Sequence, residues 1–190
     1  VWLARAVAGC AAEKSLFELF KAEDKEFDER LLGEWKIQSG TEFIPEAQSG
    51  RIVFRRGGDD PEYEVTVLDL DEHGMRRACT GRLTRLGTTL FIDFGTPDLQ
   101  KRTFAEIPFP LLESHIFGRI HIDKNSVLID FLNDEWIKKQ STAGKLSLPT
   151  VETPEGLVIS APTEVLRKFA LEHANDTEAF SEIYSMMRSK

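Results

Sequence analysis

The sequence predicts a mostly β protein: an antiparallel up-and-down barrel of about eight to ten strands, with an N-terminal helical arm and two C-terminal helices packed outside. Three observations indicate this fold. Short apolar or alternating segments follow one another between residues 33 and 160. Clusters of Gly, Asp, Asn and Ser separate them, as tight turns require. Both ends of the chain instead carry apolar residues at helical spacing.

The totals agree with one globular domain. A chain of 190 residues can bury a sizeable core, and 13 Phe against 2 Tyr indicate a large apolar interior. We divide the chain into a tether or helical arm (residues 1–26), the barrel (27–160) and the C-terminal helices (161–190). The net charge of −8 disfavours a nucleic-acid partner.

The first ten residues contain a possible attachment site. The tetrad Val7-Ala8-Gly9-Cys10 resembles a bacterial lipobox, which implies cleavage before Cys10, acylation of its thiol and tethering to a membrane surface. By that resemblance the protein lies in the cell envelope, in the outer membrane or periplasm. Only nine residues precede Cys10 and Arg5 interrupts them, so an ordinary helical N-terminus of a soluble protein stays open as the alternative.

The arm leads into the first strand. Leu16, Phe20 and Phe27 have roughly helical spacing, which predicts a short helix packed on the barrel. Gly33 lets the backbone bend where the first strand begins, and Trp35 is its largest apolar anchor.

Eight strands and one shorter segment are expected after the arm. They are residues 33–39, 51–56, 62–70, 75–86, 89–94, 114–123, 127–132 and 157–160, with a short piece at 145–148. Because the connections are short, sequence neighbours should pair antiparallel. An open sheet would leave two unpaired edges, so we expect the sheet to close into a barrel.

The strand near residue 118 shows the clearest alternation. Ile116, Ile120 and Ile122 share one face of it, and Phe117 lies on the other face among polar residues. Residues 89–94 and 127–132 are apolar on both faces except at Asp93 and Asp130. A second layer should therefore cover those two strands, and the C-terminal helices are the expected cover.

Gly33-Glu34-Trp35, placed just before a run of hairpin strands, resembles the Gly-x-Trp signature that opens the first strand of lipocalins and the wider calycin group. The resemblance implies a lipocalin-like barrel over residues 27–160 in which Trp35 packs across one end. The family pairs this Trp with an Arg at the end of the last strand, and no clear equivalent occurs near Ser160.

The connection 95–112 is long, proline-marked and apolar. It forms either a lid over a cavity or a crossover packed against the barrel wall. From it and the following strand we select four candidate ligand-binding residues: Phe104, Phe109, His115 and Arg119.

The two C-terminal helices are predicted from separate patterns. Pro162 suits a helix start, and Leu166, Phe169 and Ala170 then form an apolar face. The second helix follows a capping pattern at Asn175 and Glu178. Its apolar residues are spaced i, i+3, i+4 and i+7: Phe180, Ile183, Tyr184 and Met187.

No catalytic motif emerges from the sequence. His115 and His121 share a strand face but lie about 20 Å apart at 3.3 Å per residue, so they cannot bind one metal ion. No C-x-x-C or H-E-x-x-H spacing occurs, so we expect no metal or cofactor.

Three functions stay open. The first is a cell-envelope carrier that binds a small apolar molecule or lipid. The second is a structural or interaction lipoprotein whose barrel is filled. The third and least favoured is an enzyme with a polar site at the barrel mouth.

Overall fold

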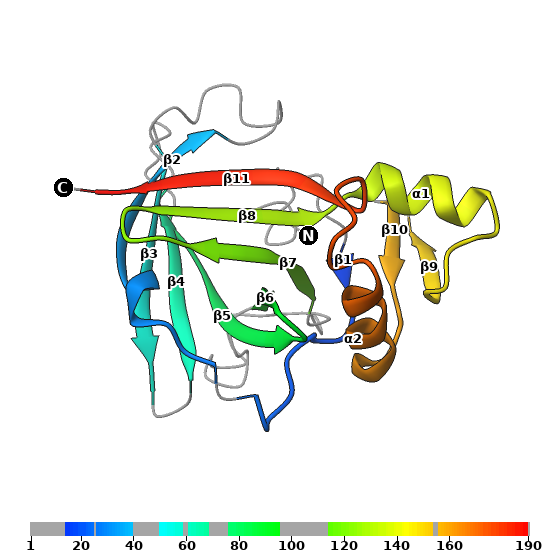
Figure 1. Cartoon of the computed structure of the whole chain (residues 1–190), viewed down its shortest axis with the longest axis horizontal. Helices are drawn as coiled ribbons and strands as arrows, with labels where there is room; N and C mark the ends of the chain where they lie inside the picture. Colours follow the sequence, from blue (N-terminus) through cyan, green and yellow to red (C-terminus); the bar gives the residue numbers. More distant parts are fainter. Residues whose placement is uncertain are drawn as a thin grey trace, which may run out of the picture.

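The computed structural model describes residues 14–24, 26–39, 50–58, 61–68, 76–95, 114–153 and 156–189. Its main body is a closed barrel of eight antiparallel strands (Figure 1). The strands are β2 (Gly33–Ser39), β3 (Arg51–Gly57), β4 (Glu62–Leu68), β5 (Arg76–Leu86), β6 (Thr89–Gly95), β7 (His115–Ile122), β8 (Ser126–Leu132) and β11 (Phe180–Arg188).

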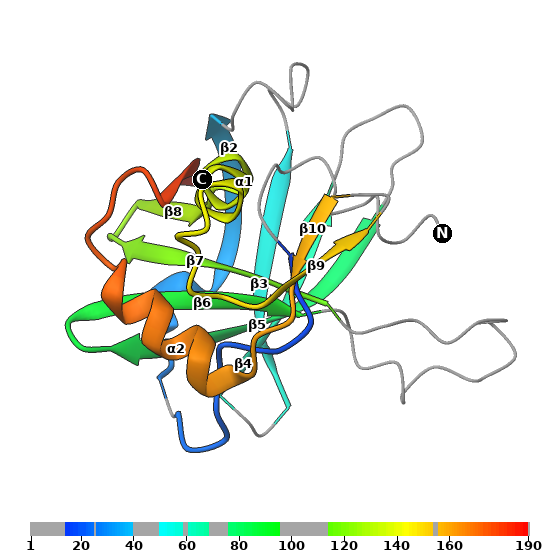
Figure 2. The same cartoon turned by 90° about the vertical axis from the view of Figure 1, so that its right-hand side faces the viewer.

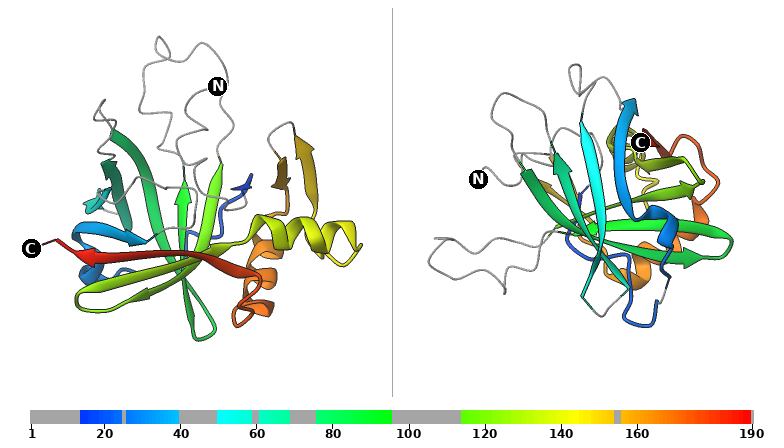
Figure 3. Two further views of the ribbon diagram at one scale, coloured as in Figure 1. Left: turned by 90° about the horizontal axis from the view of Figure 1, so that it is seen from above. Right: turned by 90° about the vertical axis from the view of Figure 1, so that its left-hand side faces the viewer.

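The barrel closes because its last strand, β11, pairs with both β2 and β8. Strands β2 to β8 pair with their sequence neighbours, including β6 with β7 across a long connection. The last strand, β11, lies between β2 and β8, where Met187 is opposite Lys36 on one side and Ser126 on the other (Figure 3). Every strand of the barrel therefore has two neighbours, and no barrel edge is left unpaired.

A smaller layer lies at one side of the barrel (Figures 1 and 2). It contains β1 (Lys14–Ser15), α1 (Asp134–Thr142), β9 (Thr150–Thr153), β10 (Gly156–Ile159) and α2 (Thr163–Glu172). β1 runs parallel to β10 and meets β7 at His115, which joins this layer to the barrel wall.

Two apolar cores result. The interior core lies inside the barrel and includes Trp35, Phe54 and Tyr63. The outer core packs α2 against the outside of the wall, and it includes Phe91 of β6, Phe117 of β7 and Phe169 of α2. The predicted second layer therefore covers β6 at Phe91, but on β8 it reaches only Leu132, because the outward-facing Leu128 is 38% exposed. Of the two predicted C-terminal helices, only α2 contributes to this layer.

The predicted alternation in β7 is also confirmed. Ile116, Ile120 and Ile122 belong to the interior core, and Phe117 belongs to the outer one. Gly118 lies on the inner face, where a Cβ atom would stand 2.7 Å from the carbonyl oxygen of Asp130. A side chain at this position would separate β7 from β8.

The predicted second C-terminal helix is wrong, because residues 180–188 form strand β11. Within this strand Tyr184 and Met186 are buried, whereas Met187 is 44% exposed, which is an alternation with period two. The capping pattern is replaced by Asp176, whose Oδ1 accepts hydrogen bonds from the backbone N–H groups of Glu178 and Ala179. The barrel takes this segment as its eighth strand, and that pairing overrides the helical spacing.

The predicted N-terminal helix is also wrong for the residues that the structure describes. Residues 14–24 form β1 followed by turns, and a 3₁₀ turn at Glu29–Leu31 precedes β2. The N–H of Leu16 donates to the Ile159 carbonyl oxygen and that of Leu19 to the Asp93 carboxylate, so the backbone of this segment is bonded across the fold and not within a helix. The short strand expected at 145–148 is likewise not formed, and β9 begins at Thr150 instead.

The described helices are too short and too polar to cross a membrane.

Candidate functional site

One end of the barrel is closed by side chains, and we call it the closed end. Trp35 is fully buried there, and its Nε1 donates a hydrogen bond to the carbonyl oxygen of Leu31 at 2.7 Å. The guanidinium of Arg188 lies 4.2 Å from the centre of a Trp35 ring and donates to the carbonyl oxygens of Leu32, at 3.0 Å, and Arg30. The first and last barrel strands are thereby fastened together.

Gly33 makes this arrangement possible. Its φ of +121° lies in a region that L side chains rarely adopt, and a Cβ atom would stand 3.0 Å from Nη1 of Arg188. Gly33 and Trp35 thus lie at the start of β2, at the closed end.

The other end of the barrel, which we call the open end, differs in its connections. Short turns join the strands at the closed end, between β3 and β4, β5 and β6, and β7 and β8. At the open end the connections span residues 40–49, 69–75 and 96–114, together with the outer layer from 133 to 179. Long connections at one end of a barrel are where binding residues concentrate.

Partly exposed apolar side chains lie at both ends of the interior core: Phe27, Leu32 and Leu90 at the closed end, and Val67, Cys79 and Phe94 toward the open end. Trp35, Phe54, Tyr63 and Leu83, in the closed half, are each at most 1% exposed. The side chains nearest the open end form a set that we call the mouth ring: Ile37, Ile52, Val67, Cys79, Phe94, Ile116 and Phe131. Of these, Val67, Cys79 and Phe94 are only partly buried although they pack on the interior core.

Aromatic rings connect the mouth ring to the interior core. The Phe94 ring centre lies 6.0 Å from that of Phe131 and 6.5 Å from that of Phe54. Phe131 in turn packs edge-on against Tyr184 at 5.6 Å. Phe94 therefore stands between the open end and the fully buried ring of Phe54 below it.

Two titratable groups of the described interior, Cys79 and Tyr63, are uncharged at neutral pH. Burial raises the pKa of the Cys79 thiol to about 12, so the thiolate that would make it reactive is not formed. Burial also raises the pKa of Tyr63 to about 12, and its hydroxyl donates to the Asp28 carbonyl oxygen and accepts from the Asp28 N–H. The described interior suits uncharged apolar groups.

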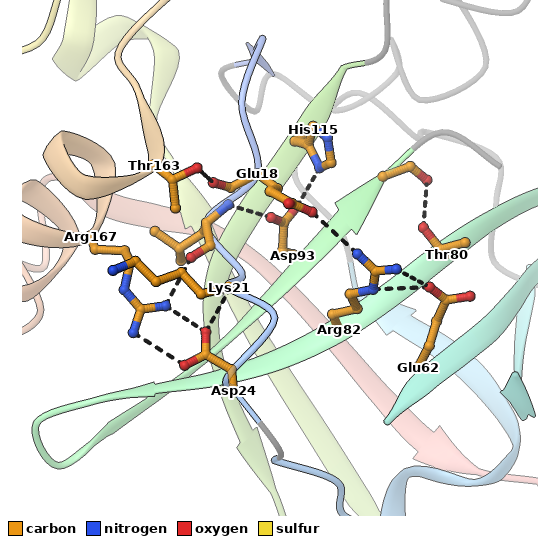
Figure 4. A network of polar contacts seen from close by, with 12 residues as sticks. Glu18, Lys21, Asp24, Glu62, Thr80, Arg82, Asp93, His115, Thr163 and Arg167 are labelled. Atoms are coloured by element: carbon orange, nitrogen blue, oxygen red, sulfur yellow. Dashed lines mark hydrogen bonds and ion pairs between the residues drawn. The ribbon is translucent and has the colours of Figure 1, made fainter. Parts of the chain in front are cut away.

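A second, polar cluster lies on the outside of the barrel wall (Figure 4). Asp93 is 3% exposed, and its carboxylate accepts a hydrogen bond from the N–H of Leu19 at 2.5 Å and lies 3.0 Å from Nδ1 of His115. Arg82 beside it is bound by Glu62 and Glu18. The pocket between these groups has a volume of about 10 Å³, which is room for one water molecule.

The same wall carries a clamp on the N-terminal segment. Arg167 of α2 donates to both carboxylate oxygens of Asp24, and its Nη1 also donates to the Leu19 carbonyl oxygen at 3.1 Å. Burial acts to raise the pKa of Asp24, but the hydrogen bonds from Arg167 and Thr84 outweigh it and hold this pKa below its usual value. The charge–charge contact fastens residues 19–24 between α2 and β5.

The candidate ligand-binding residues on β7 face away from the interior. His115 pairs with Asp93 on the outer wall. Arg119 donates to Asp130 at 3.0 Å and to the carbonyl oxygens of Ala174 and Phe180. These hydrogen bonds hold the turn before β11 against the barrel wall. Arg119 therefore has a structural role on the outside of the barrel.

Three other sequence-predicted residues, Phe104, Phe109 and Cys10, lie outside the described residues. Sequence reasoning missed Val67, Cys79 and Phe94 as members of a common ring. The inward alternation of each strand could have found them singly, but their meeting depends on how far neighbouring strands are displaced in register.

Among the described residues, no three His, Cys, Asp or Glu side chains are grouped so that they could hold a metal ion. No known protein family, curated protein or solved structure matches this chain.

Proposed function

We propose that the protein binds one small apolar molecule at the open end of the barrel, within the mouth ring. The observation that carries this proposal is the partial exposure of Val67, Cys79 and Phe94 above a fully buried lower core. Apolar side chains that face inward and still meet solvent give an apolar ligand a surface to cover.

The closed end supports a lipocalin-like assignment of the barrel. In the calycin group the Trp of the Gly-x-Trp signature pairs with an Arg from the last strand. Here Arg188 occupies that position on Trp35. It escaped sequence analysis because the last barrel strand lies at residues 180–188 and not near Ser160.

A fluorescence titration with N-phenyl-1-naphthylamine, an uncharged probe, tests the binding proposal. We expect saturable binding at one site, with displacement by an apolar extract of the native host. Val67→Trp should fill the mouth ring and weaken probe binding at least tenfold. Leu128→Trp is the matched control, since Leu128 is 38% exposed and lies outside the interior core.

Non-saturable binding, or equal affinities of the wild type and Val67→Trp, would overturn this proposal. The alternative function, a filled barrel with a structural or interaction role, is favoured by the lower interior, where Trp35, Phe54 and Tyr63 leave almost no exposed surface. If the probe finds no saturable site, the filled barrel with a structural or interaction role is the better explanation.

We further propose that Cys10 carries a lipid that tethers the barrel to a membrane surface of the cell envelope. The support is the Val7-Ala8-Gly9-Cys10 tetrad alone. Intact-mass measurement of the protein from its native host should show an acyl mass on Cys10 as the N-terminal residue. An unmodified cysteine within a longer chain would contradict the tether.

A further inference from the structure

We infer that the site at the open end is shallow and accepts compact, uncharged, ring-containing molecules and not extended acyl chains, with Phe94 as the residue that sets its depth. This inference rests on the proposed binding function, and it adds the ligand class and the specificity-determining residue.

The depth follows from burial along a single strand. Phe94 of β6 is partly exposed, whereas the next inward residue, Ile92, is fully buried. Two residues along a strand span about 7 Å. Solvent therefore reaches Phe94 but not the next layer of side chains, about 7 Å further into the barrel.

The floor beneath Phe94 is continuous. Phe54 is 1% exposed and packs between Phe94 and Tyr63, with ring centres 6.5 Å and 6.1 Å away. Val65, from the neighbouring strand, is also 1% exposed. An acyl chain entering end-on from the open end would meet this layer of side chains after a few methylene groups.

The composition of the ring selects the ligand's chemistry. Phe94 and Phe131 lie next to each other at the mouth, and aromatic groups pack favourably on such faces and edges. The seven mouth-ring side chains are apolar or aromatic, or the neutral thiol of Cys79. A buried ionic group would find no opposite charge on them, which disfavours a charged ligand.

Two uncharged fluorescent probes test this inference. N-phenyl-1-naphthylamine is compact and contains rings, and the methyl ester of cis-parinaric acid is an extended acyl chain. We expect wild-type protein to bind the naphthylamine saturably and the ester at least tenfold more weakly. Phe94→Ala should remove the upper layer of side chains, deepen the site as far as Phe54 and strengthen ester binding at least tenfold.

The control is Phe91→Ala, which removes the same side chain from the same strand. Phe91 lies in the outer core beneath α2, so its loss should leave the ratio of the two affinities unchanged. If Phe94→Ala does not fold, Phe94→Leu shortens the same side chain with a smaller loss of packing and should shift the ratio in the same direction.

The outcomes separate the two proposals. If the wild type binds neither probe, the binding function itself fails. If it binds both with equal affinity, the binding function stands and the shallow site is wrong. If the variants at Phe94 and Phe91 change the affinity ratio equally, Phe94 does not set the depth.

Discussion

Trp35 joins three parts of the closed end: the 3₁₀ turn before β2, the first barrel strand and Arg188 of the last one. Its ring is fully buried, and its single N–H is satisfied by Leu31. The side chain therefore combines a large buried apolar area with a hydrogen bond that holds the turn in place.

Replacement of Trp35 by Ala should lower the free energy of unfolding by about 3–5 kcal/mol, because it leaves a large cavity at the closed end. Urea denaturation followed by far-UV circular dichroism measures this change. Trp35→Phe, which keeps most of the ring volume, should lose less. A loss below about 0.5 kcal/mol for Trp35→Ala, typical of surface positions, would contradict the organising role of this residue.

The contact between Arg167 and Asp24 is the corresponding feature of the outer wall. Arg167→Met should lower the free energy of unfolding at pH 7 by about 1.5–3 kcal/mol, the usual range for hydrogen bonds to charged groups. Lys168→Met is the matched control, because the neighbouring contact of Lys168 with Glu172 is exposed and 3.8 Å long.

This effect should depend on pH in one direction. The pKa of Asp24 is lower in the folded protein than its ordinary value, so its contribution is present above about pH 4 and is lost as pH falls through the folded pKa. The difference between wild type and Arg167→Met should therefore shrink between pH 5 and about pH 2. A difference that stays constant over this range would show that the contact does not act through the charge on Asp24.

At the scale of elements, the strands from β2 to β8 could be predicted because their alternation and their turns agree. The last strand could not, since Phe180, Tyr184 and Met187 fit a helical stripe as well as a strand. The strand forms because β11 pairs with both β2 and β8 and closes the barrel. Its pairing with β2 joins residues about 150 positions apart in the sequence. Local patterns carry no information about such a partner.

The helix predicted for the N-terminal segment is wrong for a related reason. Its backbone N–H groups are bonded across the fold, that of Leu16 to the Ile159 carbonyl oxygen at 2.9 Å and that of Leu19 to Asp93. Among the candidate site residues, Trp35 could be predicted because Gly33-Glu34-Trp35 stands directly before a run of hairpin strands. The polar residues of β7 could be predicted to share a face, but not that this face lies under α2 and the N-terminal segment.

Hydrogen exchange tests the assignment of β11. Its amides have strand neighbours on both sides, whereas β9 pairs only with β10 among the described strands. We expect the β11 amides to exchange at least tenfold more slowly than those of Thr150–Thr153, and residues 180–188 to show β-type carbon chemical shifts in NMR spectra. Helical shifts in this segment, or equal exchange in the two strands, would contradict the assignment.

At the scale of the whole molecule, the two cores share one wall. β6 contributes Ile92 to the interior core and Phe91 to the outer core, and β7 contributes Ile120 and Phe117 in the same way. Neither core can lose its packing without exposing the other face of these strands, so we expect one cooperative unfolding transition.

Tryptophan fluorescence can follow each core separately. Trp35 reports the interior core in the variant Trp2→Phe/Trp136→Phe, and Trp136 reports the outer core in Trp2→Phe/Trp35→Phe. In each variant, the urea midpoint by fluorescence should coincide with the midpoint by circular dichroism. Midpoints that differ beyond experimental error would show that the outer layer unfolds independently.

The position of β11 as the last barrel strand in the chain has a consequence for biosynthesis. A ribosome delivers β2 early, yet the strand that completes its pairing emerges only after residue 188 has been made. Until then β2 and β8 both present open edges, and such edges invite association with other chains. Ring closure therefore joins parts of the chain that are distant in sequence, and we expect it to be the slow step of folding.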